Sequence, residues 1–236
     1  MRILLLDMET TGLVPELDDV WNIAWLVIKN NKVVKVRNCY YPIKRFGQDY
    51  WGFRFAYTEK NGLIYPMKYK PNRSYHWTED KDLIEDIRKA DILVAHNISF
   101  ELGFLRFVAK EVENKAQFCT MRASTRICGI PRVVYDYYED AWIRVGYKWT
   151  KLEEAYNYLV KDKRLERYLG DWHTAVYDLF ATLRVYERLT GTRIEVPFWI
   201  WLKAGLLKGY LRELKSKIES KAKKIKLTLK REEIPF

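Results

Sequence analysis

The sequence predicts an α/β domain in which three strands come first and helices then alternate with a further strand. The chain opens with an apolar run at residues 3–6 that stops at Asp7, a pattern typical of a strand buried on both faces. Residues 20–28 and 33–41 are two further apolar segments, and residues 30–31 form a turn between them. Strands followed by alternating strands and helices indicate a mixed β-sheet flanked by helices.

Helical and strand patterns alternate in the middle of the chain. Residues 80–90 have a helical pattern, and residues 91–95 form another short, buried strand. Asn97 or Ser99 then caps a helix that runs through Val108. The end of this strand and the start of the following helix are therefore close together in the sequence.

Two later helices complete the predicted domain, which spans residues 1–192. They cover residues 151–159 and 174–189, and the second repeats apolar residues at a spacing of three or four. Residues 43–76 are rich in aromatic and basic side chains and have no helical period, so we expect loops or hairpins there. The aromatic and basic residues of this segment are typical of half-buried strands, and they also suit a surface for single-stranded nucleic acid.

Residues 193–236 are predicted to form a basic, amphipathic, helical C-terminal extension. Pro197 can begin a helix, and apolar residues then recur every three or four positions with Lys and Arg between them. From Lys203 to Phe236 there are 11 basic and 4 acidic residues, a net charge of +7. We expect the apolar stripe to pack on its own domain, or else to dock a partner, and the basic side to contact nucleic acid.

The overall composition favours a polyanionic partner. The chain has a net charge of +11, and aromatic residues, which stack bases or fill cores, make up 15% of it. The three cysteines show no CxxC spacing, which argues for a reducing compartment. The N-terminal apolar run is too short for a signal peptide, and no run is long enough to span a bilayer. We therefore expect a soluble, cytoplasmic protein that has no membrane partner.

The first candidate for chemistry is the pair Asp7 and Glu9 at the end of the first strand. The two-residue period of a strand puts both side chains on one face, where their charges repel unless a cation lies between them. Hard divalent ions such as Mg²⁺ and Mn²⁺ prefer such oxygen ligands, and α/β sheets bind ligands at strand ends. Taken alone, the pair also fits two solvated carboxylates in a turn.

Two further groups contain ionisable residues near helix starts. Glu101 falls in the first turn of a helix, where the helix dipole favours a carboxylate. His173 comes just before another helix, whose second turn holds Asp178, and an imidazole there is suited to take a proton from water. Each also has an ordinary interpretation: Glu101 as a helix-stabilising charge, His96 as a hydrogen-bonded core histidine and His173 as a surface histidine.

The order and context of these motifs resemble those of the DnaQ-like (DEDDh) 3′–5′ exonucleases. The resemblance extends over about residues 1–190. Its main motifs are LLLDMETTGL at residues 4–13, ILVAHNISFELGFL at residues 92–105 and HTAVYDLFATL at residues 173–183. Weaker similarity occurs at residues 76–83, 118–122 and 147–159.

This resemblance implies a ribonuclease-H-like fold and hydrolysis of the phosphodiester at the 3′ end of single-stranded DNA or RNA. It implies two divalent metal ions, Mg²⁺ or Mn²⁺, held directly by Asp7, Glu9 and Asp178. Glu101 occupies the fourth acidic position, where the family usually has Asp. His173 is implied as the general base that deprotonates the attacking water. The resemblance further implies that the backbone at Thr10 and the side chain of Leu13 contact the terminal nucleotide. The full set of candidate nucleotide-binding residues is Thr10, Thr11, Gly12, Leu13, Asn97 and Phe100.

Two alternatives remain open at the level of sequence. The first is a catalytically weak or silent nucleic-acid-binding or scaffold protein on the same fold, for which Glu101 in place of Asp is the argument. The second is a proofreading or trimming subunit attached to a polymerase or another nucleic-acid-processing machine through the C-terminal helix. The sequence does not distinguish DNA from RNA, because that choice depends on contacts to the 2′-hydroxyl.

Overall fold

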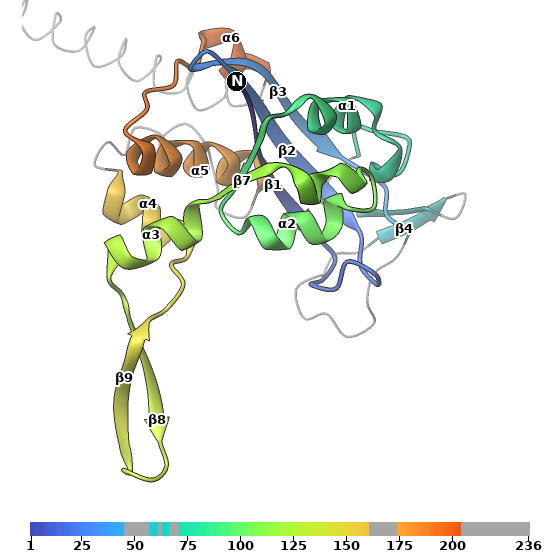
Figure 1. Cartoon of the computed structure of the whole chain (residues 1–236). Coiled ribbons are helices and arrows are strands. Elements are labelled where there is room, and N and C mark those ends of the chain that lie inside the picture. The colour runs from blue at the N-terminus through green and yellow to red at the C-terminus, as the bar shows by residue number, and fades with distance from the viewer. Residues whose placement is uncertain (45–56, 61–62, 67–70, 161–173, 204–236) are drawn as a thin grey trace, which may run out of the picture.

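In the computed structural model the described residues are 1–44, 57–60, 63–66, 71–160 and 174–203. Their centre is a five-stranded sheet with the strand order β3-β2-β1-β6-β7 (Figure 1). β1, β2 and β3 are antiparallel neighbours, whereas β1–β6 and β6–β7 are parallel, so the sheet is mixed. The strands of this sheet are β1 (Arg2–Thr10), β2 (Val20–Lys29), β3 (Lys32–Tyr40), β6 (Ile92–Ala95) and β7 (Ala116–Cys119).

Helices cover both faces of this sheet. Alternation along β1 directs Leu4 and Leu6 into a core with α1 and α2, and Ile3 and Leu5 into a second core with α4 and α5 (Figure 1). This is the ribonuclease-H-like arrangement that the motifs imply, and the predicted fold class is confirmed. The helices are η1 (Trp77–Glu79), α1 (Lys81–Lys89), α2 (Ile98–Leu105), η2 (Lys110–Asn114), α3 (Thr120–Cys128), α4 (Leu152–Leu159), α5 (Ala175–Thr190) and α6 (Phe198–Lys203).

The predicted elements agree with the structure except in the segment between residues 110 and 147. The three N-terminal strands, the strand at residues 91–95 and the helices at 80–90, 151–159 and 174–189 all form. Asn97 is the N-cap residue of α2, although its side chain makes no capping hydrogen bond. Within the segment 43–76, β4 (Tyr57–Lys60) and β5 (Leu63–Pro66) form the expected hairpin, and its side chains lie outside the described part. The sequence did not predict β7, α3 or the β8–β9 hairpin.

A buried carboxylate attaches α1 to the sheet. Asp86 of α1 forms ion pairs with Arg2 of β1, at 2.5 Å, and with Lys35 of β3, at 2.6 Å. It also accepts a hydrogen bond from the indole Nε1 of Trp25 at 2.9 Å. These partners compensate the cost of burying the charge of Asp86. Removing one of them would leave that charge buried and only partly compensated, which would destabilise the fold. The network fixes α1 across the start of β1, at the opposite end from Asp7.

The first residues of the predicted C-terminal extension pack on the domain. Ile194 and Ile200 are buried in the same core as α5, and the backbone N–H of Val33 donates to the carbonyl of Glu195 at 2.9 Å. The ring of Trp201 stacks on Phe180, with 4.6 Å between the centroids. The basic remainder, residues 204–236, lies outside the described residues. Of the helices described, none is both long and apolar enough to cross a membrane.

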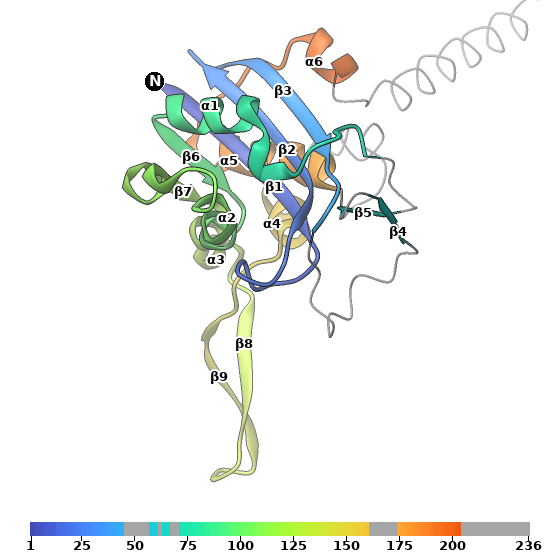
Figure 2. The same cartoon turned by 90° about the vertical axis from the view of Figure 1, so that its right-hand side faces the viewer.

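A long hairpin projects from the body between α3 and α4 (Figure 2). It consists of β8 (Pro131–Asp136) and β9 (Ala141–Tyr147), joined by a four-residue turn at residues 137–140. Among the described strands these two pair only with each other. The N-terminus lies at the far end of the molecule from the hairpin in both views (Figures 1 and 2).

Candidate active site

Three carboxylates from two distant parts of the chain converge at the end of β1. Asp7 and Glu9 lie opposite Ala24 and Asn22 of β2 in the antiparallel register. Alternation places Asp7 and Glu9 on the face of β1 that α5 covers, and Asp178 lies in the first turn of α5. One carboxylate oxygen from each of the three residues lies within 4.8 Å of the other two. The spacing of Asp7 and Glu9 and the helix position of Asp178 therefore produce a common site.

Burial and mutual repulsion make this group of carboxylates electrostatically unfavourable by itself. Burial raises the pKa of Asp7 well above its usual range, and the charges of Asp178, Glu101 and Glu9 raise it further. Burial, followed by the charge of Asp178, raises the pKa of Glu9 to about 7. A nearby cation would relieve both effects, and an all-oxygen ligand set fits a hard divalent ion.

Glu101 lies beside this group but is not one of its three closely spaced members. Its side chain, on α2, is only 4% exposed, and burial raises its pKa to about 8. Its charge is among those that raise the pKa of Asp7. Oε2 of Glu101 is buried and has no hydrogen-bond partner among the described residues. A buried acceptor in this condition suits a ligand that the carboxylate could bind.

His96 is a hydrogen-bonded core histidine, as expected from the sequence. Its Nδ1 lies 2.9 Å from Oγ1 of Thr120, and its Nε2 lies 2.9 Å from the carbonyl oxygen of Thr150, to which it donates as a neutral ring. Burial lowers the pKa of His96 to about 4. The side chain therefore joins the end of β6 to the starts of α3 and α4, directly before the helix that carries Glu101.

The loop after β1 is closed by two aspartates. Thr11 and Asp19 exchange two hydrogen bonds: Thr11 N–H donates to Asp19 O at 2.8 Å, and Asp19 N–H donates to Thr11 Oγ1 at 2.9 Å. The carboxylate of Asp18 accepts from Thr11 Oγ1 at 3.2 Å and from the N–H of Val14 at 3.0 Å. A Cβ atom on Gly12 would lie 2.2 Å from that carboxylate, so only glycine fits there.

His76 holds the same loop from a distant segment. Its Nε2 lies 3.1 Å from Oδ1 of Asp19, and both side chains are buried. Oδ2 of Asp19 accepts from the backbone N–H of Lys44 at 2.6 Å. The sequence motifs assigned no role to His76, Asp18 or Asp19, and the only local signal was the weak similarity at residues 76–83.

The remaining predicted site residues differ in their surroundings. Leu13 is 64% exposed at the outside of the loop, and Thr10 donates through Oγ1 to the carbonyl of Gly12 at 2.6 Å. Asn97 is exposed at the start of α2, and Phe100 is half-buried with its ring edge-to-face against Phe104. His173 lies outside the described residues, so the structure does not test its position.

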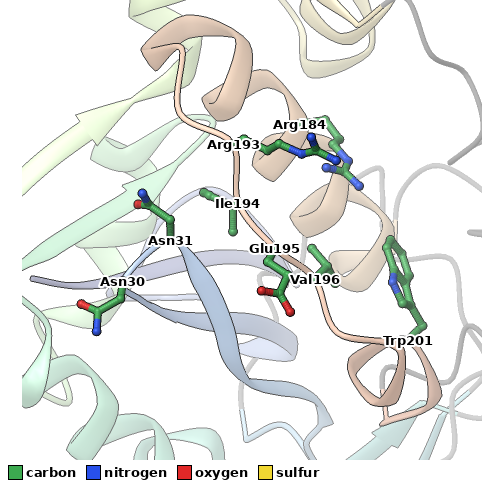
Figure 3. Close-up of a pocket in the computed structure, with 8 residues that line it drawn as sticks. All are labelled: Asn30, Asn31, Arg184, Arg193, Ile194, Glu195, Val196 and Trp201. Carbon is green, nitrogen blue, oxygen red and sulfur yellow. The ribbon is translucent and has the colours of Figure 1, made fainter.

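A cavity of about 650 Å³ lies at the other end of the sheet. It is formed where the turn after β2 meets the end of α5 and the chain before α6 (Figure 3). The turn is near the start of β1, because Arg2 pairs with Lys29 in the register. The length of β1 therefore separates this cavity from the carboxylates. Its lining residues are Asn30, Asn31, Arg184, Arg193, Ile194, Glu195, Val196 and Trp201.

Comparison with known proteins finds similarity to a polymerase and to exonucleases. Over 155 residues, or 64% of the chain, it is 28% identical to a DNA polymerase III of the PolC type from Mycoplasmopsis pulmonis. The match spans only 10% of that polymerase. No family model matches the chain.

The comparison with solved structures finds similarity to two exonuclease complexes. Exonuclease X in complex with 5′-overhanging duplex DNA has a TM-score of 0.46 and 19% identity, over 81% of this chain and 91% of that one. The zinc-bound form of the E. coli ExoI–ssDNA complex has a TM-score of 0.49 and 14% identity, over 80% of this chain and 40% of that one.

Proposed function

We propose that this chain is a metal-dependent 3′–5′ exonuclease of the DnaQ-like (DEDDh) type that hydrolyses the terminal phosphodiester of single-stranded DNA or RNA. The observation that carries the proposal is the convergence of Asp7, Glu9 and Asp178 within 4.8 Å. These are the residues that the resemblance assigns to metal binding. A group of half-buried carboxylates, of which Asp7 and Glu9 have raised pKa values, has a physical reason to exist if it binds cations.

In this proposal Asp7, Glu9 and Asp178 hold two divalent ions, Mg²⁺ or Mn²⁺, through carboxylate oxygens. When bound, the ions offset the negative charge on the attacking and leaving oxygens of an in-line displacement. Glu101 occupies the fourth acidic position. Its unpartnered buried oxygen and its effect on the pKa of Asp7 support a place at the edge of the same site.

The other steps are assigned to side chains that handle the proton and the nucleotide. His173, two residues before α5, takes the proton from the attacking water. The exposed side chain of Leu13 and the backbone at Thr10 contact the terminal nucleotide, and the hydrogen bonds made by Asp18 and Asp19 keep their loop in place. Asn97 and Phe100 line the other side of the nucleotide, with Thr11 and Gly12 as part of the loop.

The test is digestion of 5′-labelled single-stranded DNA and RNA in Mg²⁺, Mn²⁺ or EDTA. We expect a ladder that shortens from the 3′ end, requires metal and disappears in Asp7→Asn. Glu113→Gln is the matched control, because it also removes one carboxylate charge, from an exposed position, and should digest normally. Equal digestion by Asp7→Asn and the parent chain would refute the assignment.

Glu101 supports a second candidate, a catalytically weak or silent nucleic-acid-binding protein. Its carboxyl is longer than that of the usual Asp and stands outside the closely spaced group of three. If the parent chain binds strands but cleaves none in either metal, Glu101→Asp is the variant to test. Cleavage that appears only in Glu101→Asp would establish that this position silences the site.

We further propose that residues 1–192 form the nuclease domain and that residues 193–236 add a basic extension. The extension contacts nucleic acid or a polymerase-like partner, which the similarity to a PolC-type polymerase supports. Deleting residues 204–236 tests this role without touching the packed segment at Ile194 and Ile200. Loss of salt-sensitive strand affinity would support phosphate binding, and unchanged affinity would leave only the partner role.

A further inference from the structure

One face of the β8–β9 hairpin carries a row of aromatic rings. Tyr135 and Trp142 are opposite each other in the register, and their ring centroids are 5.4 Å apart in an edge-to-face arrangement. Tyr137 continues the row into the turn, with its centroid 5.1 Å from that of Tyr135. Trp142 is 71% exposed and Tyr137 is 88% exposed. The row is therefore available to a binding partner.

Arg144 extends this row towards the body of the protein. It lies opposite Val133, and the two-residue period puts both on the same face as Tyr135 and Trp142. Its guanidinium carbon lies 5.0 Å from the ring centroid of Tyr147, within the range of a cation–π contact. The strand positions of this face hold no acidic residue. The strand positions of this face thus combine aromatic rings with one cation, Arg144.

The three acidic residues of the hairpin lie at its tip, and two of them, Asp136 and Asp140, have structural roles there. Asp136 faces the other side and accepts from the backbone N–H of Tyr138 at 2.9 Å. Asp140 accepts a hydrogen bond from the hydroxyl of Tyr135. These contacts hold the turn and the ring of Tyr135 in place, and they do not involve Trp142 or Arg144.

The base of the hairpin is attached beside the carboxylates. The N–H of Lys148 donates to the carbonyl of Ile130, which closes the base, and Thr150 binds the ring of His96. His96 directly precedes α2, the helix of Glu101. The hairpin extends from this end of the sheet, away from the N-terminus (Figures 1 and 2). A strand with its 3′ end at the carboxylates can therefore reach it.

We propose that the aromatic face of the β8–β9 hairpin binds single-stranded nucleic acid a few nucleotides upstream of the 3′ end. The position of the 3′ end rests on the proposed nuclease function. Aromatic rings with interleaved cations are the usual means of binding unpaired bases without sequence preference, and a chain with a net charge of +11 attracts polyanions. A lone two-stranded hairpin is only marginally stable in water, so contact with a strand also stabilises it.

The test is the affinity of the full chain for fluorescein-labelled DNA of about 4 and about 20 nucleotides, measured by anisotropy in EDTA. We expect Trp142→Ala to weaken binding of the long strand about tenfold and to leave the short strand unaffected, because stacking on one ring is lost. Ile143→Ala is the matched control, since it truncates a neighbouring side chain on the opposite face. Trp142→Phe retains a ring and should keep most of the affinity.

Each outcome decides the proposal. Equal loss in Trp142→Ala and Trp142→Phe, or in Ile143→Ala, would show that hairpin folding rather than stacking is measured, and unchanged long-strand binding would also overturn it. Light scattering tests whether the face instead binds a second copy of the chain. If Trp142→Ala dissociates an oligomer and leaves the affinity for the strand intact, the face binds a second copy and the proposal is overturned. Because binding is measured without metal, a chain that binds through Trp142 but cleaves nothing would overturn the nuclease function and keep this inference.

Discussion

The backbone N–H of Ala175 donates a hydrogen bond to Oδ1 of Asn22, 3.2 Å away, across 153 residues of sequence. Ala175 is the first residue of α5, and Asn22 is fully buried in β2, opposite Glu9 in the register. One side-chain amide therefore fixes the start of α5 against the sheet. Asp178 lies three residues further along, in the first turn of α5. The same bond therefore helps to set the distance of Asp178 from Asp7 and Glu9.

We predict that Asn22→Leu lowers both stability and activity. Leucine fills a similar volume but leaves the N–H of Ala175 unpaired and removes the donor that Asn22 supplies to the carbonyl of Cys39. The expected decrease in the free energy of unfolding is about 1–3 kcal/mol, the usual cost of unsatisfied buried polar groups. Urea unfolding measures the stability, and 3′-end digestion of the folded variant measures the activity.

Asn38→Ala is the control for this prediction. It removes the Asn38 acceptor of Asn22 and leaves the bond to Ala175 intact. It should reduce stability while digestion continues at close to the parent rate. Equal digestion rates in Asn22→Leu and Asn38→Ala would mean that the bond to α5 does not position Asp178.

The sequence predicted the parts of the site that depend on local patterns. The apolar run before Asp7 defined β1, and the period of a strand put Glu9 on the same side. Helix patterns placed Glu101 in a first turn and Asp178 in a second turn, whereas Asp178 lies in the first turn of α5. Only the resemblance connected the two residues to β1. Asn22 showed no such signal, because a polar residue in an apolar strand has no local partner that reveals its role.

Two other features depend on tertiary contacts that no short pattern contains. The pairing of His76 with Asp19 joins segments that are far apart in the chain. The packing of residues 194–201 on the sheet depends on space left between β3 and α5. The β8–β9 hairpin was different: its β-branched and aromatic residues favour strands, but its turn of Tyr, Tyr, Glu and Asp lacks the Gly or Asn that marks short hairpins.

We predict that Gly12→Ala disrupts the loop after β1 through contact with Asp18. The added Cβ would lie 2.2 Å from Oδ2 of Asp18, so the carboxylate must leave its hydrogen bonds to Thr11 and Val14. We expect a loss of about 1–3 kcal/mol in the free energy of unfolding, typical of overpacking, together with weaker substrate binding. The measurements are urea unfolding and the KM for digestion.

A double-mutant cycle with Asp18→Ala identifies the cause. If the clash with the carboxylate is responsible, Gly12→Ala should cost little in a chain that already has Asp18→Ala. Additive losses in the double variant would instead show that contact with Asp18 is not the cause.

We predict opposite effects of Asp7→Asn on stability with and without metal. In EDTA the variant should be more stable than the parent chain by about 1 kcal/mol, because it removes the carboxylate whose ionised form is disfavoured by burial and by the charges of Asp178, Glu101 and Glu9. Mn²⁺ should raise the Tm of the parent chain and not that of Asp7→Asn, since ligand binding to the folded state stabilises it. An equal shift in Tm for both proteins would place metal binding elsewhere.

We predict that His96 makes the folded chain less stable as the pH falls from about 6.5 to about 4. The unfolded chain binds a proton at His96 near pH 6.5, its ordinary pKa, whereas burial lowers the pKa to about 4 in the folded chain. Between these values the unfolded state binds more protons, so acidification favours it, by about 3 kcal/mol once pH 4 is reached. The raised pKa values of Glu9 and Glu101 act in the opposite direction, so the parent chain alone does not isolate the effect.

His96→Gln provides the necessary reference. Its amide can donate to the carbonyl of Thr150 and accept from Thr120, the two partners of the imidazole, and it does not titrate. The difference in unfolding free energy between the parent chain and His96→Gln, measured in urea from pH 4 to pH 7, cancels the contribution of the carboxylates. That difference should change by about 3 kcal/mol over the range in the direction that favours the parent chain at pH 7. A constant difference would mean that His96 is protonated as easily in the folded chain as in the unfolded one.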